Sequence, residues 1–165
     1  MKLLQPDLHI DRLADIDLDA WHEKGIRCIL VDLDNTISPW REGSITEEAR
    51  DFFARARAVG MTAILFSNAK EAKAREAAWS IGIAYYASAG KPFSWTYRKA
   101  LLELSYCKEE TMAIGDQVFT DVLGGNIMGL TTVLIPPISA AEFFGTKVLR
   151  FLERVLAGRK TPYPS

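Results

Sequence analysis

Four short polar segments follow four apolar runs along the chain, and their residue types suit phosphate chemistry. They occupy residues 32–36 (DLDNT), 67–68 (SN), 90–92 (GKP) and 115–121 (GDQVFTD). Carboxylates at the ends of buried strands are costly unless they are paired, hydrogen-bonded or bound to a metal. Two aspartates stand at i and i+2, and a serine, a lysine and a further aspartate follow other strands. The pattern therefore indicates a catalytic site rather than a solvated loop.

Asp32 and Asp34 can divide two roles between them if their surroundings differ. A carboxylate held next to Mg²⁺ stays ionised and can attack phosphorus, while its neighbour can hold a proton for the leaving oxygen. Mg²⁺ prefers oxygen ligands and keeps several waters, so Asp32, Asp116 and one backbone carbonyl are a suitable protein share of its ligands. Gly115 is expected to let the backbone turn sharply beside the metal. A helix N-cap is the alternative role for Asp116.

The remaining polar residues each have more than one interpretation. Asp121 could support the metal or Lys91, or be the acid in the first turn of its own helix. Ser67 is expected to begin a helix, where a hydroxyl and free backbone N–H groups form an anion site, although a plain N-cap would use the same residue. The ammonium of Lys91 could neutralise a phosphoryl oxygen. Ser67, Asn68 and Lys91 are thus the predicted substrate-binding residues.

The chain alternates strand-like and helix-like segments five times, which is the signature of a doubly wound α/β fold with a five-stranded parallel sheet. Apolar runs predict strands at residues 27–33, 61–66, 83–87, 111–114 and 131–135. Helices are expected at residues 46–58, 69–80, 93–104, 121–128 and about 139–157. Two capping boxes, Ser44 with Glu47 and Ser139 with Glu142, support two of the helix starts. Ligands in such folds collect outside the carboxyl ends of the strands, where all four polar segments fall.

Length and composition predict one soluble domain spanning residues 1–165. Apolar residues make up 48% of the chain and charged residues 25%, with a net charge of −1, which does not indicate nucleic-acid binding. Cys28 and Cys107 form no metal or redox motif, so a reduced, cytoplasmic setting is expected. The N-terminal residues do not form a secretory signal, and no apolar stretch approaches the length of a membrane span.

The four segments in this order resemble the motifs of the haloacid dehalogenase (HAD) superfamily of phosphatases. DLDNT resembles the first motif, and SNA, GKP and GDQVFTD resemble the second, third and fourth. The whole chain, including its SPWREG loop and EFFGTK segment, resembles the YqeG-type group within subclass III. That group is similar to the mitochondrial phosphatidylglycerophosphate phosphatases.

The resemblance implies a role for each matching residue. Asp32 would be the nucleophile that forms an aspartyl-phosphate. Asp34 would be the general acid and then the base, and its backbone carbonyl would bind Mg²⁺. Ser67 and Lys91 would hold the phosphoryl group. Asp116 would complete the metal site.

The intervals between the motifs leave no room for a cap domain, which closes over small substrates in this superfamily. An open site suits a large substrate: a phospholipid head group, a phosphoprotein or a nucleic-acid end. A phosphatase of soluble metabolites or nucleic-acid ends is the alternative enzyme. A receiver-like signalling module is disfavoured because receivers place the acidic pair, the acceptor aspartate and the lysine in a different order. A catalytically idle scaffold is disfavoured because no motif is degraded.

Two further regions could contact a substrate or a surface. The last expected helix carries apolar residues at helical spacing and a basic end, which suits either core packing or peripheral contact with a membrane or partner. Trp40 and Arg41 could reach substrate at the mouth of the site or could pack within their loop. The sequence does not indicate an oligomeric state.

Overall fold

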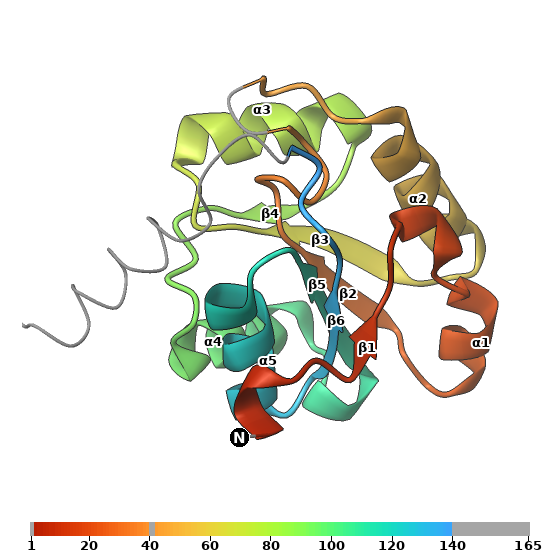
Figure 1. Cartoon of the computed structure of the whole chain (residues 1–165), viewed down its shortest axis with the longest axis vertical. Helices are drawn as coiled ribbons and strands as arrows, with labels where there is room; N and C mark the ends of the chain where they lie inside the picture. Colours follow the sequence, from red (N-terminus) through yellow and green to blue (C-terminus); the bar gives the residue numbers. More distant parts are fainter. Residues whose placement is uncertain (1, 40–41, 140–165) are drawn as a thin grey trace, which may run out of the picture.

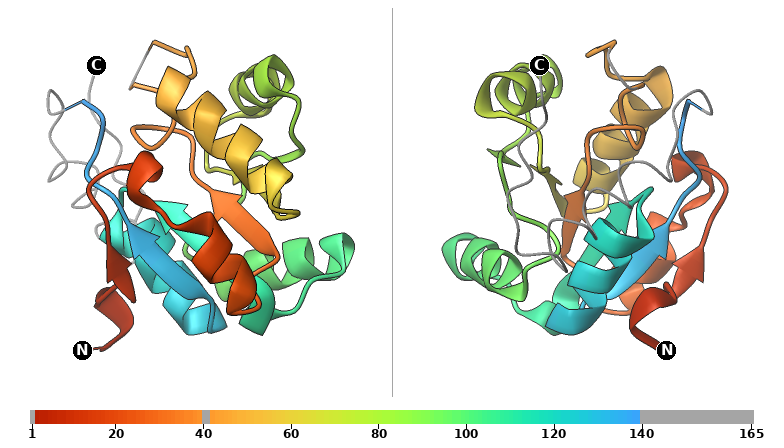
Figure 2. Two further views of the ribbon diagram at one scale, coloured as in Figure 1. Left: turned by 90° about the vertical axis from the view of Figure 1, so that its right-hand side faces the viewer. Right: turned by 60° about the vertical axis from the view of Figure 1, so that its left-hand side comes forward.

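The computed structural model describes residues 2–39 and 42–139, which form helices packed on both faces of one parallel sheet (Figures 1 and 2). The six strands of the sheet lie in the order β1–β6–β5–β2–β3–β4, and every neighbouring pair is parallel. Their bounds are β1 Leu8–His9, β2 Cys28–Val31, β3 Thr62–Phe66, β4 Tyr85–Tyr86, β5 Thr111–Gly115 and β6 Thr131–Leu134. The predicted doubly wound α/β fold is thereby confirmed.

The prediction of five strands was wrong by one. The additional strand, β1, is a two-residue edge strand in which Leu8 pairs with Val133 of β6. The side chain of Asp7 supports this pairing, because its Oδ2 accepts a hydrogen bond from the backbone N–H of Thr132 at 2.8 Å. Two residues are too few to show a strand periodicity, so β1 is defined only by its partner.

In the described part of the chain, five α-helices lie on the two faces of the sheet, as Figure 2 also shows for their arrangement. Their bounds are α1 Leu18–Glu23, α2 Glu47–Ala58, α3 Glu71–Ile81, α4 Ser94–Leu104 and α5 Leu123–Met128. Helices α1, α2 and α3 pack on one face, and α4 and α5 pack on the other. The helix α1 was not predicted. The first and second motifs are separated by α2 and β3, and the second and third by α3 and β4. The described residues between these motifs therefore contain no cap domain.

Alternating residues of β2 divide the core into two clusters. Ile29 and Val31 pack with Phe52 of α2 on one face, while Cys28 and Leu30 face the cluster of α4 on the other. All four β2 side chains are buried, because helices cover this central strand from both sides. This burial explains why the sequence of β2 is a continuous run of apolar residues.

Two predicted helix starts differ from the structure. Helix α2 is capped by Thr46, whose hydroxyl accepts a hydrogen bond from the N–H of Ala49 at 3.2 Å, so the predicted capping box with Ser44 was wrong. A capping box places its acid at the third helical position, whereas Glu47 is the first residue of α2. Helix α3 starts at Glu71 rather than near residue 69.

Several sequence predictions fall on residues that the structure does not describe. They are the contacts of Trp40 and Arg41 and the final helix from residue 140 on, including Glu142 of its predicted capping box. Within residues 2–39 and 42–139, no helix is long and apolar enough to cross a membrane.

Candidate active site

The four polar segments meet at one edge of the sheet because they follow the carboxyl ends of neighbouring parallel strands. Asp32 follows β2, Ser67 follows β3, Lys91 follows β4 after a short loop, and Asp116 follows β5. A pocket of about 430 Å³ opens at this edge. It is lined by Asp32, Asp34, Ser67, Asn68, Ala69, Lys70, Lys73, Lys91, Gln117 and Thr120. The structure thus brings the predicted site residues together.

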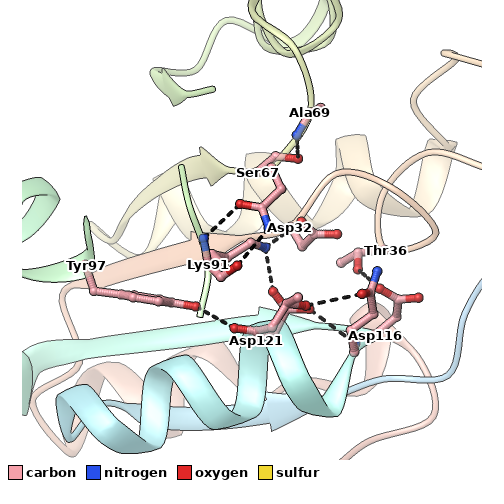
Figure 3. Close-up of polar contacts among 11 residues, drawn as sticks. Asp32, Thr36, Ser67, Ala69, Lys91, Tyr97, Asp116 and Asp121 are labelled. Atoms are coloured by element: carbon pink, nitrogen blue, oxygen red, sulfur yellow. Dashed lines mark hydrogen bonds and ion pairs between the residues drawn. The ribbon is translucent and has the colours of Figure 1, made fainter. Parts of the chain in front are cut away.

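Lys91 lies between two aspartates at the base of the site (Figure 3). Its Nζ donates to Asp32 Oδ1 at 2.6 Å and to Asp121 Oδ1 at 2.5 Å. Lys91 is only 4% exposed. Burial by itself would lower the pKa of Lys91, but the carboxylates of Asp121 and Asp32 more than offset it and hold the pKa above its usual range. The lysine is therefore a fixed positive charge.

The side chain of Asn68 holds the backbone of Lys91. Its Oδ1 accepts the Lys91 N–H at 2.8 Å, and its Nδ2 donates to the Lys91 carbonyl at 3.0 Å. The peptide bond between Lys91 and Pro92 is cis. Both polar groups of the Lys91 backbone are therefore tied to the second motif. Asn68 was predicted to bind substrate, and that role stays a prediction beside this positioning contact.

Three buried carboxylates form a group that could hold a metal ion. Asp32, Asp116 and Asp121 each offer an oxygen within 4.8 Å of the others. Asp32 Oδ2 and Asp116 Oδ2 are buried and accept no hydrogen bond within the described residues. Burial raises the pKa of Asp32 to about 6 and that of Asp116 to about 8. Buried carboxylate oxygens that accept no hydrogen bond suit a hard divalent cation, which would bind them as ligands.

Asp121 differs from the other two acids because both of its oxygens are already engaged. Oδ1 accepts from Lys91, and Oδ2 accepts from the backbone N–H of Gln117 at 3.2 Å and from the hydroxyl of Thr120 at 3.3 Å. Of its three predicted roles, the structure shows the contact with Lys91. Asp121 lies in a single π-helical turn, Val118–Val122, which aims it back at the sheet edge.

Gly115 provides space rather than a special backbone turn. A Cβ added at Gly115 would lie 2.2 Å from Cγ of Asp121. Its φ does not lie in the left-handed region, unlike that of Gly90. The predicted reason for this glycine, a sharp turn beside the metal, was therefore wrong. The glycine is needed because the Asp121 carboxyl group packs directly against the strand end.

The second motif also differs from its sequence interpretation. Ser67 is not the N-cap of α3, because that helix begins at Glu71 after Lys70. The Ser67 hydroxyl instead accepts the N–H of Ala69 at 3.0 Å and stabilises the turn that enters the pocket. Ser67 is buried yet lines the pocket, so its hydroxyl lies where a phosphate oxygen could bind.

Asp34 is paired with a lysine that the sequence analysis did not identify. Lys73 of α3 donates to Asp34 Oδ1, and both residues line the pocket. Asn35 follows with a positive φ of 61°, which turns the chain away from the strand direction. Lys73 lies outside every motif, and the contact forms only in the folded chain, where α3 packs on the same face of the sheet as α2.

Comparisons with known proteins identify the family to which this chain belongs. A sequence model of the HAD-hydrolase-like family matches residues 88–136. The chain is 30% identical over 153 residues to the probable phosphatase YqeG of Bacillus subtilis, a match that covers 93% of this chain and 89% of that protein. The chain belongs to the HAD superfamily of phosphatases, in its YqeG-type group. It is accordingly a phosphoric monoester hydrolase, and a phosphorylated compound is its substrate.

Other relatives of this HAD phosphatase extend the comparison. It is 31% identical over 166 residues to phosphatidylglycerophosphate phosphatase 1 of Arabidopsis thaliana, and it covers 47% of that longer protein. A Listeria monocytogenes protein of known structure shares the fold with a TM-score of 0.58 and 16% identity, over 78% of this chain and 99% of that one. The cobalt-bound octulosonate 8-phosphate phosphatase of Haemophilus influenzae shares it with a TM-score of 0.55 and 13% identity, over 68% and 69% of the two chains.

The substitution Gly115→Ala should displace Asp121 and thereby Lys91. We expect a destabilisation of about 1–3 kcal/mol, as for other insertions into packed sites, together with a fall in phosphatase activity. Denaturant unfolding and turnover of an aryl phosphate measure the two effects. In an Asp121→Gly background the same substitution should destabilise the protein by clearly less, and an undiminished cost there would contradict the proposed contact.

Binding of a divalent cation should depend on pH. Since the pKa of Asp116 is about 8 in the folded chain against an ordinary 3.8, the folded state binds this proton more tightly than the unfolded state. The free energy of unfolding without metal should therefore fall as the pH rises from about 4 to about 8. Added Mg²⁺ should stabilise the protein more at the upper end of that range and release protons on binding. Thermal unfolding with Mg²⁺ or with EDTA checks this. The control Asp116→Asn should remove the fall between about pH 6 and pH 8, where Asp32 with its pKa of about 6 contributes little, and should weaken the effect of Mg²⁺.

Proposed function

We propose that this phosphatase depends on Mg²⁺, acts through an aspartyl-phosphate on Asp32, and prefers a large substrate of which phosphatidylglycerophosphate is the first candidate. The observation that carries the catalytic part is the contact of Lys91 with only one oxygen of Asp32. Oδ1 is held by the Lys91 ammonium, while Oδ2 accepts no hydrogen bond within the described residues. A nucleophile that also binds a metal needs two differently placed oxygens, and Asp32 offers them.

The metal would be held by Asp32, Asp116 and the backbone carbonyl of Asp34, with Asp121 as support through Lys91. A bound Mg²⁺ would neutralise charge on the transferring phosphoryl group. The fixed ammonium of Lys91 adds to this neutralisation, and phosphoryl transfer depends mainly on such charge compensation and on positioning. Ser67 would orient the phosphoryl group through its hydroxyl.

The reaction would proceed in two steps. A carboxylate oxygen of Asp32 attacks phosphorus, and the bond from phosphorus to the leaving oxygen breaks as Asp34 donates a proton to that oxygen. Water then attacks the phosphorus of the aspartyl-phosphate while Asp34 takes a proton from it, and inorganic phosphate leaves with Asp32 restored. The contact with Lys73 would fix the orientation of the Asp34 carboxyl group.

The large-substrate proposal is supported by the open site and by one relative. No cap domain lies between the described motifs, so the substrate's own bulk must exclude water. The plant relative is a phosphatidylglycerophosphate phosphatase by name. We further propose one domain over residues 1–165 and a cytoplasmic location, with peripheral contact at a membrane and no nucleic-acid partner.

Asp32→Asn should abolish turnover and leave the fold intact, because a neutral amide is a poor nucleophile and a weak metal ligand. Release of phosphate from an aryl phosphate with Mg²⁺ measures the loss, and circular dichroism checks the fold. Retention of more than about a tenth of the wild-type rate, equivalent to less than about 1.4 kcal/mol of barrier, would exclude Asp32 as the nucleophile.

The substrate proposal is tested by comparing kcat/KM for phosphatidylglycerophosphate in mixed micelles with that for glycerol 3-phosphate. We expect the lipid to have the higher value, because without a cap the binding energy must come from substrate groups beyond the phosphate. A higher value for glycerol 3-phosphate would favour the alternative, a phosphatase of soluble metabolites. Asp32→Asn, inactive on both, serves as the control for contaminating phosphatases.

A further inference from the structure

Two lysines on the α3 side of the pocket have no contact with the phosphoryl group in the proposed chemistry, although one of them, Lys73, orients Asp34. Lys70, the residue before α3, and Lys73, in its first turn, both line the pocket (α3 is labelled in Figure 1). Lys70 is the N-cap residue of α3 and has an extended backbone, so the two side chains reach the pocket from either side of the helix start. The pocket therefore has a cationic wall separate from Lys91.

The charge of Lys70 has no counterpart nearby. Within residues 2–39 and 42–139, no hydrogen bond or ion pair joins the Lys70 ammonium to another side chain. Glu71, the next residue, does not line the pocket, and its carboxylate accepts from the hydroxyl of Tyr85 at 2.5 Å. The N-terminus of α3 also lacks a side-chain cap, so its free N–H groups add positive potential at the same wall.

The groups that would bind the scissile phosphate are separate from this cationic wall. Lys91 and Ser67 are buried and lie beside Asp32 (Figure 3). Lys70 lines the same pocket but is exposed to solvent, which places it at the pocket rim. A pocket of about 430 Å³ falls within the range of about 300–1,000 Å³ typical of sites that hold whole ligands. It therefore has room for a second substituent next to a phosphate monoester.

We propose that Lys70 and Lys73 form a second anion subsite, which binds a further phosphate group of the substrate beyond the scissile one. An ammonium carries three N–H donors, so Lys73 can contact Asp34 and a substrate oxygen together. This inference rests on the proposed function and adds a specificity to it: substrates with two phosphate groups joined by a short spacer. A phosphodiester in a lipid head group and a second monoester in a soluble bisphosphate share this chemistry.

The test compares substrates that differ only in the second phosphate. We would measure kcat/KM for propane-1,3-diol bisphosphate and for propyl phosphate, with wild type, Lys70→Gln and Lys70→Arg. Lys99→Gln is the matched control, since Lys99 lies on α4 outside the pocket and pairs with Glu103. The ratio of the two kcat/KM values should fall about tenfold in Lys70→Gln, the loss expected for one charged hydrogen bond, and should be retained in Lys70→Arg and Lys99→Gln.

Two results would overturn the subsite. An equal loss on both members of each substrate pair, soluble and lipid, would show that Lys70 acts through the scissile phosphate or the fold, and no change in either pair would show that it binds nothing. A third arm uses a short-chain phosphatidylglycerophosphate against glycerol 3-phosphate. A fall in the ratio confined to the lipid pair assigns the subsite to a phosphodiester, and a fall confined to the soluble pair assigns it to a monoester.

A measurement without turnover separates this inference from the proposed function. Calorimetry with the Asp32→Asn variant should show that the bisphosphate binds more tightly than propyl phosphate, and that adding Lys70→Gln removes the difference. If wild type hydrolyses none of the four substrates but this difference is found, the proposed substrate class fails while the subsite stands. If the bisphosphate binds no more tightly than propyl phosphate, and the short-chain lipid no more tightly than glycerol 3-phosphate, the subsite fails whatever the turnover.

Discussion

The buried ion pairs of Lys91 with Asp32 and Asp121 are the interaction on which the site depends. Removing charges from water is costly, and removing one partner of a buried pair typically costs about 3–5 kcal/mol because the other charge is left alone. With Lys91 only 4% exposed, these contacts require close placement from three separate strand ends. Much of the surrounding structure serves this placement: Asn68 holds the lysine backbone, and Gly115 leaves the space into which the Asp121 carboxyl group fits.

Packing behind the site fixes the turn that carries Asp121. The buried Tyr97 of α4 donates its hydroxyl proton to the carbonyl of Thr120 at 3.0 Å. Its ring centroid lies 4.7 Å from that of Phe66 of β3, with the two ring planes tilted by 49°. A Cβ at Gly124 would lie 2.7 Å from the Tyr97 ring, so α5 can approach only because that residue is glycine. The helices on this face thus position a carboxylate as well as bury apolar surface, which links the core directly to the chemistry.

The sequence alone predicted those features that depend on a single segment of the chain. The continuous apolar run before Asp32 predicted a central strand, and the order of the motifs predicted which side chains meet at the sheet edge. Features that depend on contacts between distant segments could not be predicted: the edge strand β1 exists only through β6, and Lys73 meets Asp34 only through the packing of α3. Ser67 suits an N-cap by residue type, yet the chain makes a further turn before α3 begins.

The net charge of the pocket links the expected metal ion to the role of Lys70. Four carboxylates, those of Asp32, Asp34, Asp116 and Asp121, face the two ammonium groups of Lys73 and Lys91, so the ionised site carries an excess of two negative charges. A divalent cation would balance that excess and leave the fully ionised site with no net positive charge to attract a dianionic phosphate from a distance. The exposed ammonium of Lys70 and the uncapped N-terminus of α3 then become the nearest positive potential on the rim. Because opposite charges at a pocket mouth raise the local concentration of a charged ligand, this rim would both attract the substrate and orient it with its second anionic group toward α3.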